Sequence, residues 1–269
     1  LVEKLYWTFQ AEKIGDLVSK GADAPLSSVL TIDQNDFSYS FGKDTSKQIS
    51  NLENQVPPRS SNSIFLPAKE VLSLHHIILK SREQDKVFGF DDTYFDLAKA
   101  LRIATTKGNN FVEFAKSRRQ LEGILGGVIE YDEASGHWLF AKGRHKFPIG
   151  ITAEGIKKIA ILDTLLGNRY LDTQSIVLID EPELGLHPFA IATLGALMKS
   201  ASRQHQLIIS TQSVELVNQF DVEDLIVVDK QNGASTFKRL EEDQLSEWLQ
   251  DYSLGDLWKK NLLGGRPQS

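Results

Sequence analysis

The chain has 269 residues, of which 41% are hydrophobic and 25% charged, so it can bury a substantial core and has the composition of an ordinary globular protein. Its net charge of -6 argues against a uniformly basic surface for nucleic acid, although it leaves room for a local basic patch. The absence of cysteine excludes a disulfide framework and a thiolate metal site and fits a cytoplasmic location, and no apolar run approaches the roughly 20 residues of a membrane span.

Residues 1–66 are predicted to form strands after a short helical start. Apolar residues at helical spacing after Leu1 indicate that the sequence opens inside a helix, so we expect a fragment; a processed terminus is the alternative. Alternating apolar residues then predict strands at 28–32, 37–41 and 64–66, with a polar, proline-containing loop over 42–63.

The middle of the sequence is predicted to be helical first and extended afterwards. Helical patterns cover 68–81, 92–106 and 110–125, which we group as a helical insertion that ends at Gly126-Gly127. Short strands with turn residues between them follow at 128–131, 138–141 and 145–148, and they predict an antiparallel unit.

From Thr152 onward, predicted helices and strands alternate. The helices lie at 152–166, 187–202 and 214–219, and the strands at 175–179, 206–210 and 224–228. Because the strands are almost continuously apolar, we expect a parallel sheet covered on both faces. With a helical tail at 241–260, the expected division is an N-terminal lobe over 1–66, the helical insertion over 67–127 and a C-terminal lobe over 128–269.

Two adjacent carboxylates, Asp180 and Glu181, follow the strand 175–179, where an open α/β sheet binds its ligands. Adjacent side chains of a strand point to opposite faces, so the two can hold different roles. Asp180 could orient water in a Mg²⁺ shell, and Glu181 could polarise the water that attacks the γ-phosphate of ATP. Pro182 stops the strand because it has no N–H to donate. The alternative is that these charges merely end a strand before a turn.

The neighbouring residues favour the first interpretation. The stretch 176–188, Ile-Val-Leu-Ile-Asp-Glu-Pro-Glu-Leu-Gly-Leu-His-Pro, resembles the Walker B and D-loop segments of the ABC-like ATPases, and it is most similar to bacterial AAA-family ATPases of the OLD-like type. The resemblance implies an α/β P-loop NTPase head with a parallel sheet core, an antiparallel lobe and a helical insertion. It further implies that Asp180 acts on the metal, that Glu181 is the general base and that His187 lies at the nucleotide.

Two other segments extend the resemblance. Residues 206–213, Gln-Leu-Ile-Ile-Ser-Thr-Gln-Ser, resemble the switch that senses the γ-phosphate; Gln212 stands where many members have His, and an amide can still bond a phosphate oxygen or the attacking water. Thr152-Ala153-Glu154-Gly155 occupies the place of the signature motif, which in relatives reaches the ATP of a second subunit. A helix N-terminus suits phosphate, but Thr152 could equally be an ordinary N-cap.

A phosphate-binding loop is missing from this sequence. No stretch reads Gly-x-x-x-x-Gly-Lys-Ser/Thr, and Gly42-Lys43-Asp44-Thr45 lacks the upstream glycine and has Asp in place of the hydroxyl. Either the loop lies before Leu1 or the protein is a degenerate ATPase. We expect the first, because relatives place this loop near their N-terminus.

The resemblance therefore implies a subunit that binds ATP and Mg²⁺ between two head-to-tail copies and hydrolyses the ATP. Hydrolysis would switch a partner, which could be a nuclease or DNA as in anti-phage defence. The alternative is a non-catalytic scaffold or regulatory subunit that has lost nucleotide binding, against which the intact Asp180-Glu181 pair weighs.

Overall fold

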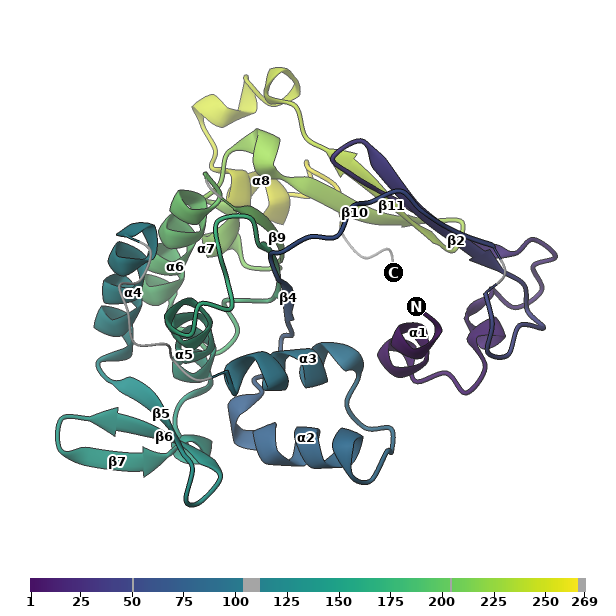
Figure 1. The fold of residues 1–269 in the computed structure, drawn as a ribbon. Coiled ribbons are helices and arrows are strands. Elements are labelled where there is room, and N and C mark those ends of the chain that lie inside the picture. Colours follow the sequence, from purple (N-terminus) through teal and green to yellow (C-terminus); the bar gives the residue numbers. More distant parts are fainter. Residues whose placement is uncertain (50, 104–111, 204, 266–269) are drawn as a thin grey trace.

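The computed structural model describes residues 1–49, 51–103, 112–203 and 205–265, and within helix α4 it describes side chains from Arg119 onward. Figure 1 shows a helical region built on a short parallel sheet, with antiparallel strands extending from it. The α-helices are α1 (Val2–Phe9), α2 (His75–Glu83), α3 (Asp92–Leu101), α4 (Val112–Leu125), α5 (Glu154–Gly167), α6 (Pro188–Ala201), α7 (Val214–Val217) and α8 (Leu254–Lys259). The strands are β1 (Leu26–Ile32), β2 (Asn35–Phe41), β3 (Asn51–Asn54), β4 (Ser63–Leu66), β5 (Val128–Asp132), β6 (His137–Lys142), β7 (His145–Pro148), β8 (Ile176–Asp180), β9 (Gln206–Ser210), β10 (Ile226–Gln231) and β11 (Ala234–Arg239).

The parallel sheet has the strand order β4-β8-β9, and its two faces differ in their covering. The face that carries buried Val177 packs against α5 and α6. On the opposite face, Phe65, Leu178 and Ile208 form one row across the three strands, and Ile208 is 51% exposed. The expected covering of both faces is therefore not found within the described residues, although the apolar sequence of all three strands suits it.

The last predicted parallel strand, 224–228, is wrong in position and in pairing. Residues 222–224 form a 3-10 turn, and β10 pairs with β11 in an antiparallel hairpin. The reason is the two-residue turn Asn232-Gly233, where both residues have positive φ angles of 51° and 82°. An Asn-Gly turn of this kind matches the twist of antiparallel strands and favours a hairpin.

Other local predictions need smaller corrections. Part of the expected loop over 42–63 forms β3, which pairs with β2. The tail over 241–260 contains 3-10 turns at 242–244 and 248–250 and the short helix α8, instead of one continuous helix. The helix expected over 92–106 ends at Leu101, and the one expected over 68–81 begins only at His75, after a 3-10 turn at 72–74. The expected helix start at 110 lies outside the described residues.

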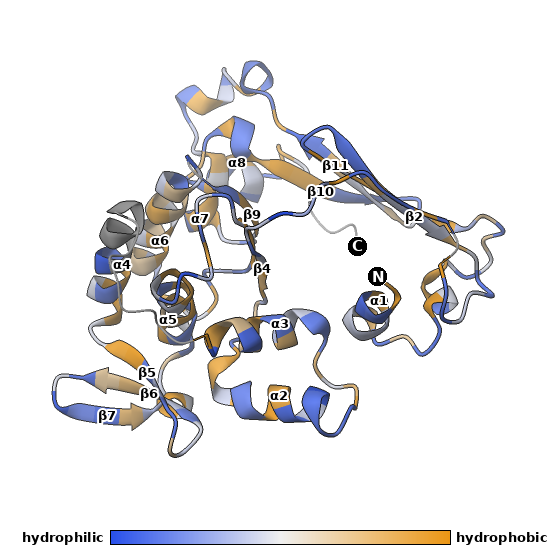
Figure 2. Cartoon of the chain, in the orientation of Figure 1, coloured by the Kyte–Doolittle hydropathy of each residue, from blue (hydrophilic) through white to orange (hydrophobic). Residues whose placement is uncertain are grey.

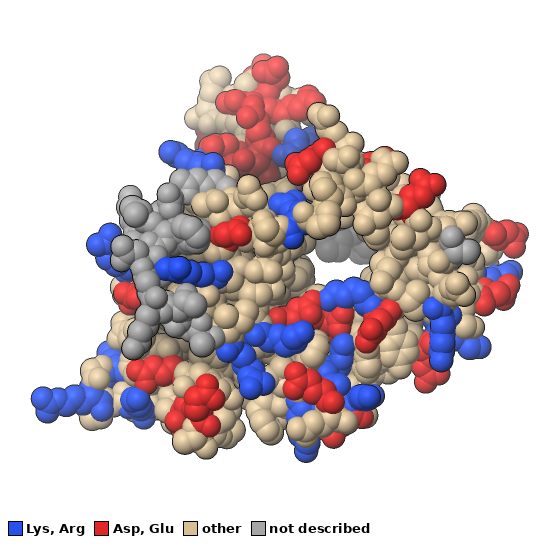
Figure 3. All heavy atoms as spheres, in the orientation of Figure 1, with Lys and Arg blue, Asp and Glu red and all other residues tan. Residues whose placement is uncertain are grey.

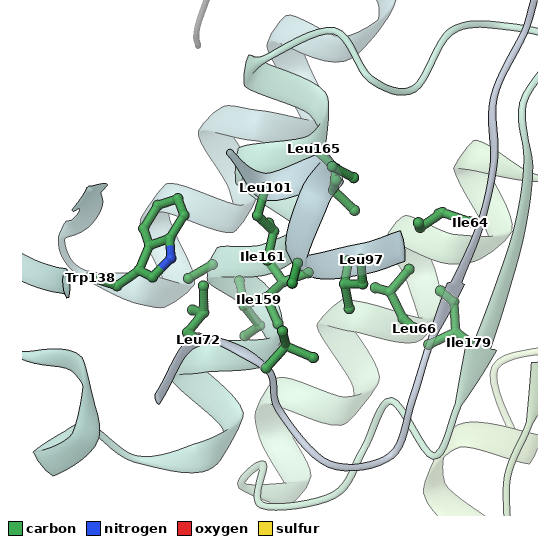
Figure 4. Close-up of a cluster of buried hydrophobic side chains, with 14 of the residues drawn as sticks. Ile64, Leu66, Leu72, Leu97, Leu101, Trp138, Ile159, Ile161, Leu165 and Ile179 are labelled. Atoms are coloured by element: carbon green, nitrogen blue, oxygen red, sulfur yellow. The ribbon is translucent and has the colours of Figure 1, made fainter. Parts of the chain in front are cut away.

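The main hydrophobic core joins the helices α2, α3, α4 and α5 to the parallel sheet and to β6. Figure 4 shows Trp138, Leu97 and Leu165 among its buried side chains, together with Ile64 and Ile179 from the sheet. Figure 2 shows the same apolar character along β4 and α5. This core takes residues from all three expected parts of the chain, although β1, β2 and β3 of the first part contribute none. The division at residues 66 and 127 stays a prediction.

An opening runs through the molecule in the space-filling view of Figure 3. By its place in Figure 1, it lies between β4 and α3 on one side and α1 and the antiparallel strands on the other. Among the described helices, none has the length and apolar character needed to cross a membrane.

Candidate functional site

The carboxyl end of β8 carries Asp180 beside the end of β9. The register pairs Asp180 with Ser210, and the Ser210 hydroxyl donates a hydrogen bond to the Asp180 carboxylate. The strand ends here because Pro182 follows and is buried. Asp180 therefore lies at the carboxyl edge of the parallel sheet, as the sequence predicts. This edge is called the rim below.

Glu181 leaves the strand in an unusual backbone conformation. Its φ angle is 44°, in the left-handed region that few residues other than glycine adopt. Its N–H donates to the carbonyl oxygen of Ser210 at 2.9 Å, so the chain stays attached to β9 while it turns away from the strand direction. Glu181 is only partly buried, and its side chain can therefore meet water at the rim.

Glu183 is a rim residue that the sequence analysis did not single out. Its Oε1 accepts a hydrogen bond from the Thr211 hydroxyl at 2.6 Å and from the Gln212 backbone N–H at 3.3 Å. Its Oε2 is buried and has no partner among the described residues. Glu183 thus joins the loop after β8 to the loop after β9, and it leaves the exposed Gln212 side chain available for other contacts.

Lys158 of α5 brings a positive charge to these carboxylates. Its Nζ donates to the carbonyl oxygen of Glu181 at 2.5 Å. Burial lowers the pKa of Lys158, against the carboxylates of Glu183, Glu181 and Asp180, which act to raise it. The ammonium group of Lys158 is thus half-buried, and it bonds the Glu181 carbonyl oxygen while it lies near the three carboxylates. No sequence pattern predicts this role for Lys158, since a lysine on a helix is ordinarily a surface residue.

The four residues predicted to act in trans lie at the start of α5. Ala153 is the N-cap, and no side chain caps this helix, so the alternative of Thr152 as an ordinary N-cap does not apply. Glu154 is exposed and pairs with Lys157 at 2.8 Å. Gly155 is buried against the loop after β8, where an added Cβ would lie 2.7 Å from the carbonyl oxygen of Gly185. The helix start therefore lies directly on that loop.

His187 begins α6 as its N-cap. Its Nδ1 accepts a hydrogen bond from the N–H of Phe189 at 3.2 Å, and both residues are exposed. Pro188 at the first helical position suits this start, because its fixed φ favours a helix and it has no N–H to leave unpaired. This capping bond accounts for His187 structurally, and a contact with nucleotide stays a prediction.

The rim can supply oxygen ligands to a hard cation. Asp180 and Ser210 present one carboxylate and one hydroxyl, which suit a Mg²⁺ ion either directly or through water of its shell, with the remaining ligands from phosphates and water. Among the described residues, no group of three or more His, Asp or Glu is placed to hold a metal by itself. A small cavity lies behind the rim, lined in part by Asp180, Lys158 and Glu70; a larger one, under α5 and α6, is lined almost entirely by apolar side chains.

The parallel sheet, the helices on one face and the acids at its carboxyl edge define an α/β head of the P-loop NTPase type. Among solved structures, an Smc head bound to the C-winged helix domain of ScpA is 14% identical, covers 88% of this chain and 82% of its own, and has a TM-score of 0.51. This likeness shows the fold, and the predicted fold class is confirmed. An Smc head from Pyrococcus furiosus (13% identity, coverage 91% and 86%, TM-score 0.49) and one from Thermotoga maritima (16%, 80% and 73%, 0.40) also match.

Residues 19–218 match the family described as "AAA domain, putative AbiEii toxin, Type IV TA system". The match spans most of the chain, and the chain belongs to this AAA domain family of ATPase-type nucleotide-binding domains. Among curated proteins, no match was found. The predicted ABC-like or AAA-family ATPase class is thereby confirmed, whereas the OLD-like type stays a prediction.

Proposed function

We propose that this chain is the catalytic part of an ATP-hydrolysing head that works as a nucleotide-sandwich dimer. The single observation that carries the proposal is the placement of Asp180 and Glu181 at the carboxyl end of β8, next to the loop after β9. Ligands of open α/β sheets bind at this edge. The hydrogen bonds of Glu183 support it further, because they hold the two loops together at that edge.

Each residue has a role that its chemistry permits. Asp180 accepts hydrogen bonds from water in the magnesium shell, and magnesium when bound neutralises charge on the phosphates. Glu181 takes a proton from the attacking water, and the Gln212 amide bonds the γ-phosphate or that water. His187 lies at the nucleotide in this proposal. Thr152, Ala153, Glu154 and Gly155 present the start of α5 to the ATP of a second copy, where free N–H groups favour phosphate.

In this proposal the phosphate-binding loop comes from residues outside these 269, because no stretch of them reads Gly-x-x-x-x-Gly-Lys-Ser/Thr. A parallel strand added beside β9 would end at the same rim as Asp180, and a helix returning from it would cover the row Phe65, Leu178 and Ile208. The partly exposed row and the opening beside β4 support this part of the proposal. The P-loop has this strand-loop-helix form.

Hydrolysis would open and close the dimer and so switch a bound partner. We propose a nuclease or DNA as that partner, in a bacterial anti-phage or toxin–antitoxin setting, in the cytoplasm. The family description names a toxin of a Type IV system and supports the setting. The second candidate is a non-catalytic scaffold of the same fold; the absence of a phosphate-binding motif from this sequence favours it, and the two rim carboxylates weigh against it.

The test is Glu181→Gln in the intact protein that carries the phosphate-binding loop. We expect ATP to bind as before and turnover to fall by a factor on the order of 10² or more, the scale of losing a general base. Glu133→Gln, an exposed turn residue away from the rim, is the matched control. Turnover at the wild-type rate in Glu181→Gln contradicts the assignment, and tight magnesium-dependent ATP binding by the 269-residue chain contradicts the need for an added loop.

A further inference from the structure

Helix α5 is joined directly to the loop that contains Glu181. Lys158 bonds the Glu181 carbonyl at 2.5 Å, one turn after Gly155 packs on the Gly185 carbonyl. The loop is closed on itself as well, since the Leu184 N–H donates to the same Glu181 carbonyl oxygen at 3.1 Å. The first turn of α5 and the loop after β8 therefore form one packed unit.

The backbone of Glu181 needs such support. A left-handed conformation is strained for a residue with a side chain and persists only when its surroundings hold it. The carbonyl of Ser210 fixes the N–H of Glu181, and both Lys158 and the Leu184 N–H fix its carbonyl oxygen, with Lys158 as the partner that comes from outside the loop. The anchor from Lys158 is charge-assisted, and such bonds are stronger than neutral ones.

The adjacent lysine acts on a different neighbour. Lys157 is almost fully buried and bonds the carboxylate of Glu70 at 3.2 Å, in the segment after β4. Two consecutive lysines thus attach α5 to two different parts of the fold. Only Lys158 reaches the loop that carries the rim acids.

We propose that Lys158 is a positioning residue that makes the start of α5 and the backbone of Glu181 move together. A contact made at Thr152–Gly155 then changes the position of the Glu181 carboxylate. The inference rests on the proposed function, in which the start of α5 meets the nucleotide of a second copy. Lys158 itself touches neither water nor phosphate in this scheme, and it acts through the Glu181 carbonyl.

The first test needs no catalysis. In the 269-residue chain, Lys158→Met should speed amide hydrogen exchange at Glu181 and Leu184 by about tenfold or more, the scale of losing one hydrogen bond to a charged group. Exchange within β8 and β9 should stay unchanged, which shows that the variant is folded. Lys158→Arg should restore the slow exchange, and Lys199→Met, a lysine of α6 paired with Asp221, should have no effect. Unchanged exchange at Glu181 in Lys158→Met overturns the inference; if Lys158→Met does not fold, Lys158→Gln is measured in its place.

The second test uses the intact protein with its phosphate-binding loop. Lys158→Met should lower kcat by about tenfold while KM for ATP changes by less than about threefold, because the residue acts on the catalytic loop and not on binding. Lys158→Arg should recover most of kcat. If the wild type hydrolyses no ATP but the exchange result holds, the proposed function fails and the anchoring by Lys158 stands. If kcat of Lys158→Met equals that of the wild type, the positioning role is wrong.

Discussion

Replacing Gly155 by alanine should destabilise the protein, although alanine is the better helix former. The added Cβ would lie 2.7 Å from the carbonyl oxygen of Gly185 and closer still to a methyl of Leu186. The carbonyl belongs to the backbone of a loop that Lys158 and Glu183 hold in place, so it cannot move aside as a flexible side chain would. Overpacking of this kind costs about 1–3 kcal/mol.

The opposing term is the helix preference of alanine over glycine, about 1 kcal/mol in a helix interior and less in the first turn, where Gly155 lies. We therefore expect a net loss of about 1–2 kcal/mol in the free energy of unfolding, from these two terms.

Urea unfolding followed by tryptophan fluorescence measures this free energy. Gly123→Ala is the matched control, because Gly123 is a helical glycine of α4 with open space around its Cβ position. That control should gain up to about 1 kcal/mol from the helix preference alone. If Gly155→Ala gains stability as Gly123→Ala does, the close packing of α5 on the loop is refuted.

Three further outcomes can be measured by the same unfolding assay. Ile208→Ala on the partly exposed row should cost less than about 1 kcal/mol and Ile179→Ala on the buried face about 2–5 kcal/mol, and equal losses would contradict the open face. Lys157→Met should cost about 3–5 kcal/mol because it leaves the buried Glu70 carboxylate without its cation, and a second change of Glu70 to Gln should restore much of the loss; no recovery would mean that the ion pair is not the cause. Burial lowers the pKa of His75 from its ordinary 6.5, so the stability that neutral His75 contributes is complete above pH 6.5 and is lost as the pH falls through its folded pKa. His75→Gln should remove this loss of stability in acid; an unchanged pH dependence would mean that another group causes it.

The parallel part of the fold could be predicted because its signals are local. An apolar run followed by Asp180-Glu181-Pro182 fixes both the strand and the point where it stops. Asn232-Gly233 is an equally local signal for the β10–β11 hairpin, and the alternation of helices and strands before it concealed that signal.

The contacts that organise the rim had no such signal. Lys158 and Glu183 meet the Glu181 carbonyl and the Thr211 hydroxyl across 23 and 28 residues of sequence. Such pairings depend on how α5 and two loops come together, and helix or strand periodicity contains no information about that.

The outer strand β9 has a consequence for handling the protein. In the described sheet β9 is an edge, and it combines free backbone groups with the apolar run Leu207-Ile208-Ile209. Edges of this kind accept strands from other molecules, which leads to oligomers and aggregates. The strand proposed above to pair with β9 would compete with strands of neighbouring chains, and dilute conditions would favour the correct pairing.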